Sequence, residues 1–195
     1  NVPGATENLA ELSYHRYRGG QRAVLEKISA TAAKLGLQTA MLELWGDRAT
    51  DQVLYSDLTA ANVSAWQGSN VSTQYRINPA RPSGPLIMKE NVRYFRQYTD
   101  YIRPGDTRIG AASSDNRFAA PVAFVGPDGA LVVVIRVSRA GQAEIPGLPE
   151  GTYHVSYAVQ SGSGVIEQPF AVANGTPLVV DVPGAGVVTV TSRAD

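Results

Sequence analysis

Residues 11–46 read ELSYHRYRGGQRAVLEKISATAAKLGLQTAMLELWG. Glu11–His15 predicts a short strand. Across residues 21–35 the apolar side chains recur at helical spacing, and Gly36 stands where the end of a helix favours left-handed backbone. Residues 37–44 contain few polar side chains and predict a second strand. A strand, a helix and a second strand in this order indicate a βαβ unit with parallel strands.

The same alternation continues toward residue 103. Thr50 is a candidate N-cap for a helix over residues 51–61, and residues 62–66 predict a third short strand. A loop rich in Gly, Ser, Asn and Pro follows as far as about residue 85, and apolar periodicity predicts a last helix over residues 91–102. We therefore expect an α/β domain over residues 1–103.

The second half of the chain has a different pattern. After the turn at residues 103–106, short β-branched segments alternate with Gly, Pro and Asn turns, and Pro127-Asp128-Gly129 is a strong hairpin signal. The strands predicted there are 108–112, 119–125, 130–137, 142–145, 152–159, 166–173, 177–182 and 187–191. Many short strands of this kind predict an all-β unit, and we expect an antiparallel β-sandwich domain over residues 104–195.

Composition excludes several classes of function. The 17 basic and 17 acidic residues give a formal net charge of zero, so the sequence offers no electrostatic footprint for nucleic acid. No apolar run approaches the roughly 18–20 residues that span a bilayer. The chain has no cysteine and two distant histidines, which excludes disulfides and makes a zinc site improbable. No phosphate-binding or dinucleotide fingerprint occurs, so we expect neither a metal nor a cofactor.

Chemistry-bearing side chains stand at the ends of the three predicted parallel strands. The first strand ends with His15 and is followed by Tyr17; the second ends near Glu43 and Trp45; the third ends at Trp66. In α/β barrels the active site is built at this end of the strands. A carboxylate surrounded by aromatic rings that can stack on sugars is what a glycosidase needs, which makes these five residues the candidate site.

Each of these residues also has a structural interpretation. Glu43 could form an ion pair with a nearby arginine, since a carboxylate in an apolar strand is costly to bury unless it is paired or functional. His15 could be a hydrogen-bonded scaffold residue, and Tyr17 could orient the carboxylate or cap a loop. Trp66 could be a sugar platform or a core residue, and Trp45 could pack as a wedge between strands.

Several strings in this order resemble glycoside hydrolase family 30, which includes glucosylceramidases, endo-xylanases and β-1,6-glucanases. His15-Arg16-Tyr17 is similar to the family's His-aromatic-Tyr string, with Arg16 in place of the aromatic residue. Leu42-Glu43 is similar to the string that carries the nucleophile, without its small hydroxyl neighbour, and Trp66 matches a tryptophan near the end of the eighth barrel strand. Residues 98–110 and 119–135 are similar to the segments that lead into a small β-sandwich.

The resemblance implies the last three or so strands of a (β/α) barrel followed by a β-sandwich. It implies a retaining mechanism acting on a β-linked glycan, with two carboxyl groups roughly 5–5.5 Å apart. Glu43 would be the nucleophile, while His15, Tyr17, Trp45 and Trp66 would contact substrate. The family's acid/base has no counterpart here and about five barrel strands are absent, so we expect a truncated hydrolase that is not active alone.

Three further expectations complete this interpretation. An incomplete barrel exposes sheet edges and apolar faces, so we expect self-association through this half. The resemblance implies an extracellular or periplasmic location. The rival hypothesis is a non-catalytic carbohydrate-binding or structural β-sandwich module, although the predicted sandwich has few aromatic residues with which to build a sugar platform.

Overall fold

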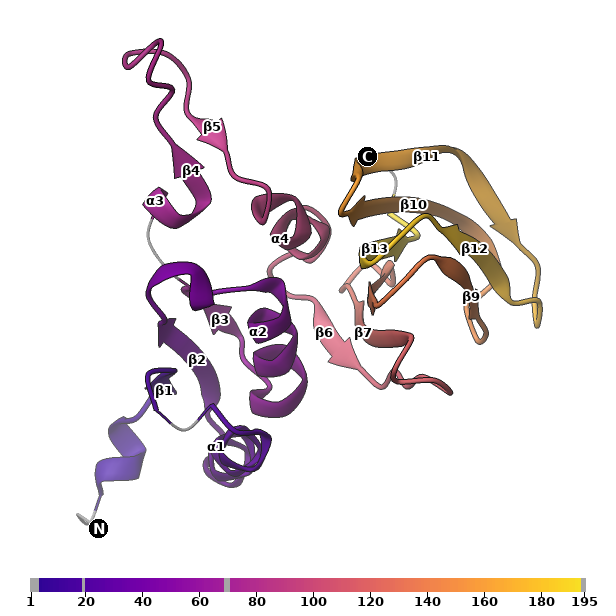
Figure 1. The fold of residues 1–195 in the computed structure, drawn as a ribbon. Coiled ribbons are helices and arrows are strands. Elements are labelled where there is room, and N and C mark those ends of the chain that lie inside the picture. Colours follow the sequence, from indigo (N-terminus) through magenta and orange to yellow (C-terminus); the bar gives the residue numbers. More distant parts are fainter. Residues whose placement is uncertain (1–3, 19, 69–70, 194–195) are drawn as a thin grey trace. The chain divides into compact units, whose positions relative to one another are not determined.

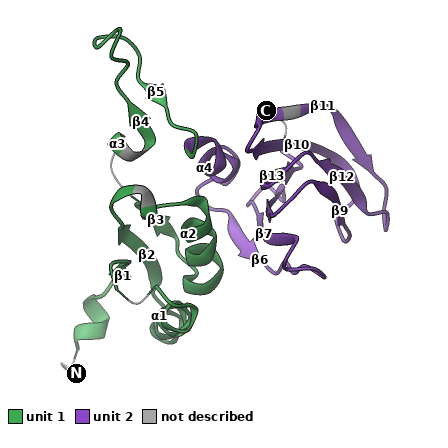
Figure 2. Ribbon diagram, in the orientation of Figure 1, with its two compact units in different colours: residues 1–91 green, residues 92–195 purple. Residues whose placement is uncertain are grey.

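The computed structural model describes residues 4–18, 20–68 and 71–193. The chain divides into two compact units, residues 1–91 and residues 92–195, each of which has its own core (Figure 1 and Figure 2).

Unit 1 is built on a three-stranded parallel sheet. Its strands β1 (Glu11–His15), β2 (Gln38–Glu43) and β3 (Ala65–Trp66) lie in the order of the chain, β1-β2-β3. The helix α1 (Arg22–Leu35) connects β1 to β2, and α2 (Asp51–Ser56) lies between β2 and β3. The predicted parallel βαβ units are therefore present.

Local signals in the sequence set the helix boundaries of unit 1. Gly36 ends α1 with φ 67°, a left-handed conformation that glycine adopts without steric cost. Thr50 caps α2, because its hydroxyl oxygen accepts a hydrogen bond from the Val53 amide at 3.3 Å. The helix expected over residues 51–61 does not stay α-helical: it continues from Asp57 to Ala61 as a π-helical segment and ends at Asn62, which has φ 54°.

The loop expected as far as about residue 85 contains two short elements that the pattern did not predict, the helix α3 (Val71–Gln74) and the strand β4 (Tyr75–Arg76). The strand β5 (Ile87–Met88) follows this loop and pairs antiparallel with β4. Two 3-10 turns, Ala5–Asn8 and Gly46–Arg48, complete the elements of this unit. The second turn directly follows Trp45 and leads toward α2.

Unit 2 starts with the helix α4 (Val92–Thr99) and continues as antiparallel sheet. Its larger sheet has six strands in the order β11-β10-β13-β8-β7-β6, and its smaller sheet pairs β12 with β9. The strand bounds are β6 Thr107–Ile109, β7 Ala119–Val125, β8 Leu131–Val137, β9 Gly141–Ile145, β10 Gly151–Val159, β11 Gly162–Val172, β12 Leu178–Val182 and β13 Gly186–Thr191. The eight strands expected in this half are all present, with ends shifted by a few residues.

The two sheets of unit 2 share one hydrophobic core. Val133, Val155 and Val190 of the six-stranded sheet belong to the same buried cluster as Ala143 and Val180 of the smaller sheet. Side chains from both inner faces meet in this way in a β-sandwich. The alternating burial of β12, whose Leu178, Val180 and Val182 are buried while the residues between them are exposed, follows from the two-residue period of a strand.

Helix α4 covers part of the other face of the six-stranded sheet. Ser156 of β10 donates a hydrogen bond to the Gln97 side-chain oxygen at 2.8 Å, and Thr189 of β13 donates to the Gln97 carbonyl at 2.7 Å. All three residues are buried. These contacts attach α4 to the second compact unit, which starts at Val92.

Candidate active site

The ends of β1 and β2 bring Glu43 beside His15. The two strands pair in regular register up to Tyr14 opposite Met41, and the next pair is His15 opposite Glu43, so β2 contains one extra residue. Met41 and Leu44 belong to the same buried cluster although they are three positions apart, whereas a regular strand would place them on opposite faces. The irregularity therefore turns the Glu43 side chain away from this cluster, as β-bulges near active sites do.

Three of the five residues predicted for the site meet at this point. The Tyr17 hydroxyl donates a hydrogen bond to Glu43 Oε1, and His15 Nδ1 lies 4.0 Å from the same oxygen. The His15 and Tyr17 rings meet edge to face, with their centroids 5.9 Å apart. The Glu43 side chain is 37% exposed, so a ligand can reach its carboxylate. The arrangement is an accessible carboxylate with one oxygen held by a phenol.

Arg48 adds a positive charge that the sequence patterns did not single out. Its guanidinium carbon lies 5.8 Å from the centroid of the Tyr17 ring, within the range of a cation–π contact. Partial desolvation, the hydrogen bond to Glu43 and the charge of that carboxylate together raise the pKa of Tyr17 to about 12. Tyr17 therefore stays protonated at neutral pH and remains a hydrogen-bond donor to Glu43.

The two tryptophans lie in different environments. Trp45 is 62% exposed and directly precedes the 3-10 turn at residues 46–48. Trp66 is half-buried: it pairs with Met41 across the sheet and packs against the cluster of Met41, Leu44 and Ala49. Its indole N–H donates a hydrogen bond to Asp57 Oδ2 at 2.9 Å. Substrate contacts at both rings remain predictions.

Asp57 is a functional candidate that the sequence analysis missed. Its side chain is fully buried, and its carboxylate accepts hydrogen bonds from Tyr14 and Trp66. Arg16 Nε lies 3.4 Å from the same carboxylate. The available signal was an acidic residue in the segment 54–61, which contains no other charged residue and in which a buried ion needs partners.

The structure contributes two observations on metals and membranes. Within residues 4–18, 20–68 and 71–193, no group of three or more His, Asp or Glu side chains gathers as a metal site would require. Among the same residues, no helix is both long and apolar enough to cross a bilayer.

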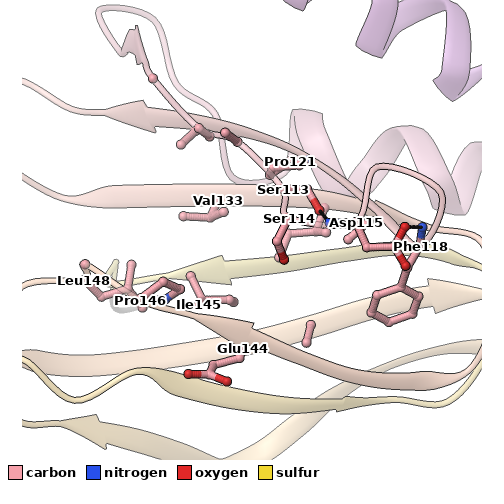
Figure 3. Close-up of a pocket in the computed structure, with 18 of the residues that line it drawn as sticks. Ser113, Ser114, Asp115, Phe118, Pro121, Val133, Glu144, Ile145, Pro146 and Leu148 are labelled. Atoms are coloured by element: carbon pink, nitrogen blue, oxygen red, sulfur yellow. Dashed lines mark hydrogen bonds between the residues drawn. The ribbon is translucent and has the colours of Figure 1, made fainter.

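A separate pocket of about 630 Å³ opens inside unit 2 (Figure 3). Apolar side chains such as Pro121, Val133 and Leu148 line much of it, and Ser113 and Asp115 lie close together among its polar residues. These two polar side chains already accept hydrogen bonds from backbone amides of their own turn. Phe118 is the one aromatic residue among the lining side chains, and the Arg139 guanidinium covers its ring at 4.7 Å. The pocket therefore lacks the row of open aromatic rings that a sugar platform needs.

Comparison with solved structures identifies the fold. A family 30 endoxylanase from Clostridium papyrosolvens matches with a TM-score of 0.78 at 16% identity, covering 100% of this chain and 51% of that chain. The endo-β1,6-glucanase gives 0.65 at 17%, covering 98% of this chain and 42% of its own. A conserved exported protein from Bacteroides fragilis gives 0.69 at 15%, covering 93% and 45%.

The chain thus spans about half the length of the solved structures that it matches. No family model matches the sequence, and no curated protein matches it. The resemblance seen in the sequence is confirmed by the structural match, because residues 1–195 have the fold of about half of a family 30 glycoside hydrolase, consistent with its C-terminal part.

Proposed function

We propose that the chain is the C-terminal portion of a retaining β-glycoside hydrolase of family 30, with Glu43 as its nucleophile. The observation that carries this proposal is the accessible Glu43 carboxylate at the end of a parallel strand, hydrogen-bonded by Tyr17 and 4.0 Å from His15. The similarity in fold to an endoxylanase and an endo-β1,6-glucanase supports a β-linked glycan as substrate. In this proposal β1, β2 and β3 are the last three strands of a (β/α) barrel.

The chemistry requires two carboxyl groups. Glu43 would attack the anomeric carbon while the bond to the leaving oxygen breaks, and an acid/base residue would give that oxygen its proton. A water would then attack the glycosyl-enzyme, lose its proton to the same acid/base and release Glu43 as carboxylate. We propose that the acid/base belongs to polypeptide outside residues 1–195, so these residues supply one half of an active site.

The other site residues have distinct roles in this scheme. Tyr17 would hold one Glu43 oxygen in place, leaving the other oxygen for attack. His15 would line the pocket beside them. Trp45, with its exposed ring, and Trp66 would contact sugar faces. An extracellular or periplasmic location is part of the proposal, and the similarity in fold to an exported protein supports it.

The test uses the complete gene product that contains residues 1–195. It would be incubated with 2-deoxy-2-fluoro-β-glycosyl fluorides of xylose and glucose, which trap the glycosyl-enzyme, and the labelled peptide would be identified by mass spectrometry. We expect the label on Glu43. Release of reducing sugar from β-1,4-xylan and β-1,6-glucan should fall by several orders of magnitude in Glu43→Gln, because the covalent route is lost.

Glu11 provides a matched control, since it is a glutamate of the same unit at the opposite end of β1. Glu11→Gln should keep near-normal activity. A label on another carboxylate would refute the nucleophile assignment. Binding of xylan with no turnover, unchanged in Glu43→Gln, would favour the alternative of a non-catalytic carbohydrate-binding module.

A further inference from the structure

The buried carboxylate of Asp57 connects two strands at the end of the sheet that carries the candidate site. Tyr14 near the end of β1 donates to Oδ1 at 2.6 Å, and Trp66 at the end of β3 donates to Oδ2 at 2.9 Å. Both carboxylate oxygens are therefore used, by side chains that are far apart in the sequence. Asp57 itself is the first residue of the π-helical segment Asp57–Ala61, which directly continues α2.

The same carboxylate holds alternate residues of the segment that leads into the site. Tyr14 packs into the buried clusters, and the Arg16 side chain, which is 9% exposed, lies 3.4 Å from Asp57. The intervening His15 side chain is 51% exposed, and Tyr17 beyond it is exposed as well. In a strand, neighbouring side chains point to opposite sides, so fixing Tyr14 on the inner side directs His15, the last residue of β1, outward. Arg16 and Tyr17 lie in the bend that follows β1, and holding Arg16 at Asp57 constrains the start of this bend, from which the Tyr17 hydroxyl reaches Glu43.

The main chain also connects Arg16 to Glu43. The Arg16 amide donates a hydrogen bond to the Glu43 carbonyl at 3.1 Å, directly beyond the point where the register of β1 and β2 shifts. A displacement of Arg16 would therefore also displace Glu43, through this main-chain hydrogen bond and through Tyr17. At β3, the opposite edge strand of the sheet, the hydrogen bond to Asp57 restrains the Trp66 indole. The Trp66 ring covers Gly68, where a Cβ would collide with the ring atoms.

We propose that Asp57 is a positioning residue for the reaction: it orients His15 and Tyr17 against Glu43 through Tyr14 and Arg16, and it fixes the Trp66 ring. This inference rests on the proposed function of Glu43. Asp57 does not touch the reacting atoms, because its side chain is fully buried. Its effect is to hold the geometry in which Tyr17 meets one oxygen of the nucleophile.

In this arrangement the Asp57 carboxylate is the counter-ion of the Arg16 guanidinium. Burial raises the pKa of Asp57, and the hydrogen bonds from Tyr14 and Trp66 together with the Arg16 charge lower it in part. An asparagine would keep the size and could still accept from the Trp66 N–H while donating to the Tyr14 oxygen. It would leave the Arg16 guanidinium without its counter-ion. Asp57→Asn therefore tests the negative charge of the carboxylate with little change in packing.

The first experiment compares Asp57→Asn with the wild type in the complete gene product, with hydrolysis of β-1,4-xylan and β-1,6-glucan as the readout. We expect kcat to fall about 10- to 100-fold, since small misplacements of catalytic groups have effects of this size, while KM changes less. Glu26→Gln is the matched control, because it removes an exposed carboxylate that pairs with Arg22 on α1. An unchanged kcat in correctly folded Asp57→Asn would overturn the proposal.

A second measurement remains decisive if Asp57→Asn folds poorly. Tyr14→Phe removes only the hydroxyl that contacts Asp57, and Tyr17→Phe removes the donor to Glu43. A positioning role predicts non-additive effects: Tyr14→Phe should lower kcat in the wild type and have little further effect in Tyr17→Phe. An equal loss of kcat in both backgrounds would mean that Tyr14 does not act through Tyr17 and would overturn this coupling, and an unchanged kcat in both would mean that Tyr14 serves stability alone.

The outcomes also separate this inference from the proposed function. If Glu43→Gln is inactive while Asp57→Asn and Tyr14→Phe match the wild type, the positioning role fails and the nucleophile stands. If Glu43→Gln is as active as the wild type, the proposed function fails first. A structural signature is available as well. The Trp66 indole N–H resonance of the complete gene product, assigned by its loss in Trp66→Phe, should shift in Asp57→Asn because this N–H donates to Asp57, and an unshifted resonance would contradict the contact.

Discussion

The hydrogen bond between Thr189 and helix α4 allows a quantitative prediction for unit 2. Helix α4 ends at Thr99, so the Gln97 carbonyl belongs to the last turn, where carbonyls lack helical partners. Thr189 is fully buried and donates to this oxygen at 2.7 Å. Thr189→Val preserves the shape of the side chain and removes the donor. The carbonyl then remains buried without this bond, which should lower the free energy of unfolding by about 1–3 kcal/mol.

This loss should be visible in thermal unfolding. For a domain of about 100 residues, 1 kcal/mol corresponds to roughly 4–8 °C, so Tm should fall by about 4–24 °C. Thr152→Val is the matched control, since Thr152 is an exposed residue of β10 and the chemical change is identical. Calorimetry of the 195-residue chain measures the shift in Tm. In this chain tryptophan fluorescence reports on unit 1, because both tryptophans, Trp45 and Trp66, lie there. Equal Tm values for the two valine variants would refute the reasoning.

Two further predictions concern pH and assembly. Hydrogen bonds and charge from Arg193 hold the pKa of Asp106 below its ordinary value, against the opposing effect of burial. A depressed pKa gives stability that is present above the unfolded-state value and lost as pH falls through the folded-state value, so urea midpoints should drop below about pH 4. Asp106→Asn should be less stable at pH 7 and should lose less on acidification; an equally steep acid loss in the variant would assign it to other groups. For assembly, β1 and β3 are the outer strands of the three-stranded sheet in the described part of the chain, and open parallel edges favour association. Light scattering of the 195-residue chain should give a mass above the 20.7 kDa monomer that rises with concentration, whereas a monomer at every concentration would contradict self-association.

The secondary structure was largely predictable because its signals are local. Apolar residues at helical spacing and Gly36 bounded α1, Thr50 marked the start of α2, and the turn at residues 127–129 separated β7 from β8. Glycine and proline act on the backbone of their own segment, so their effect does not depend on the rest of the fold. The parallel strands of unit 1 and the antiparallel sheets of unit 2 followed from the same patterns.

The packing partner of α4 was less accessible to sequence reasoning. Residues 91–102 have the periodicity of a helix, and that pattern cannot tell which neighbour the helix packs on. The hydrogen bonds of Gln97 with Ser156 and Thr189 decide it, and they join positions that are 59 and 92 residues apart.

The sequence by itself determined which residues are available for chemistry: it placed Glu43, His15 and Tyr17 at the ends of neighbouring parallel strands, because chain order and strand direction fix which ends meet. Only the tertiary structure decided which way they point. A single extra residue in β2 turns Glu43 away from Met41, and the buried Asp57 holds Tyr14 and Arg16 so that His15 and Tyr17 face the carboxylate. Strand register and a buried ion both depend on partners distant in the chain, and no local pattern encodes them.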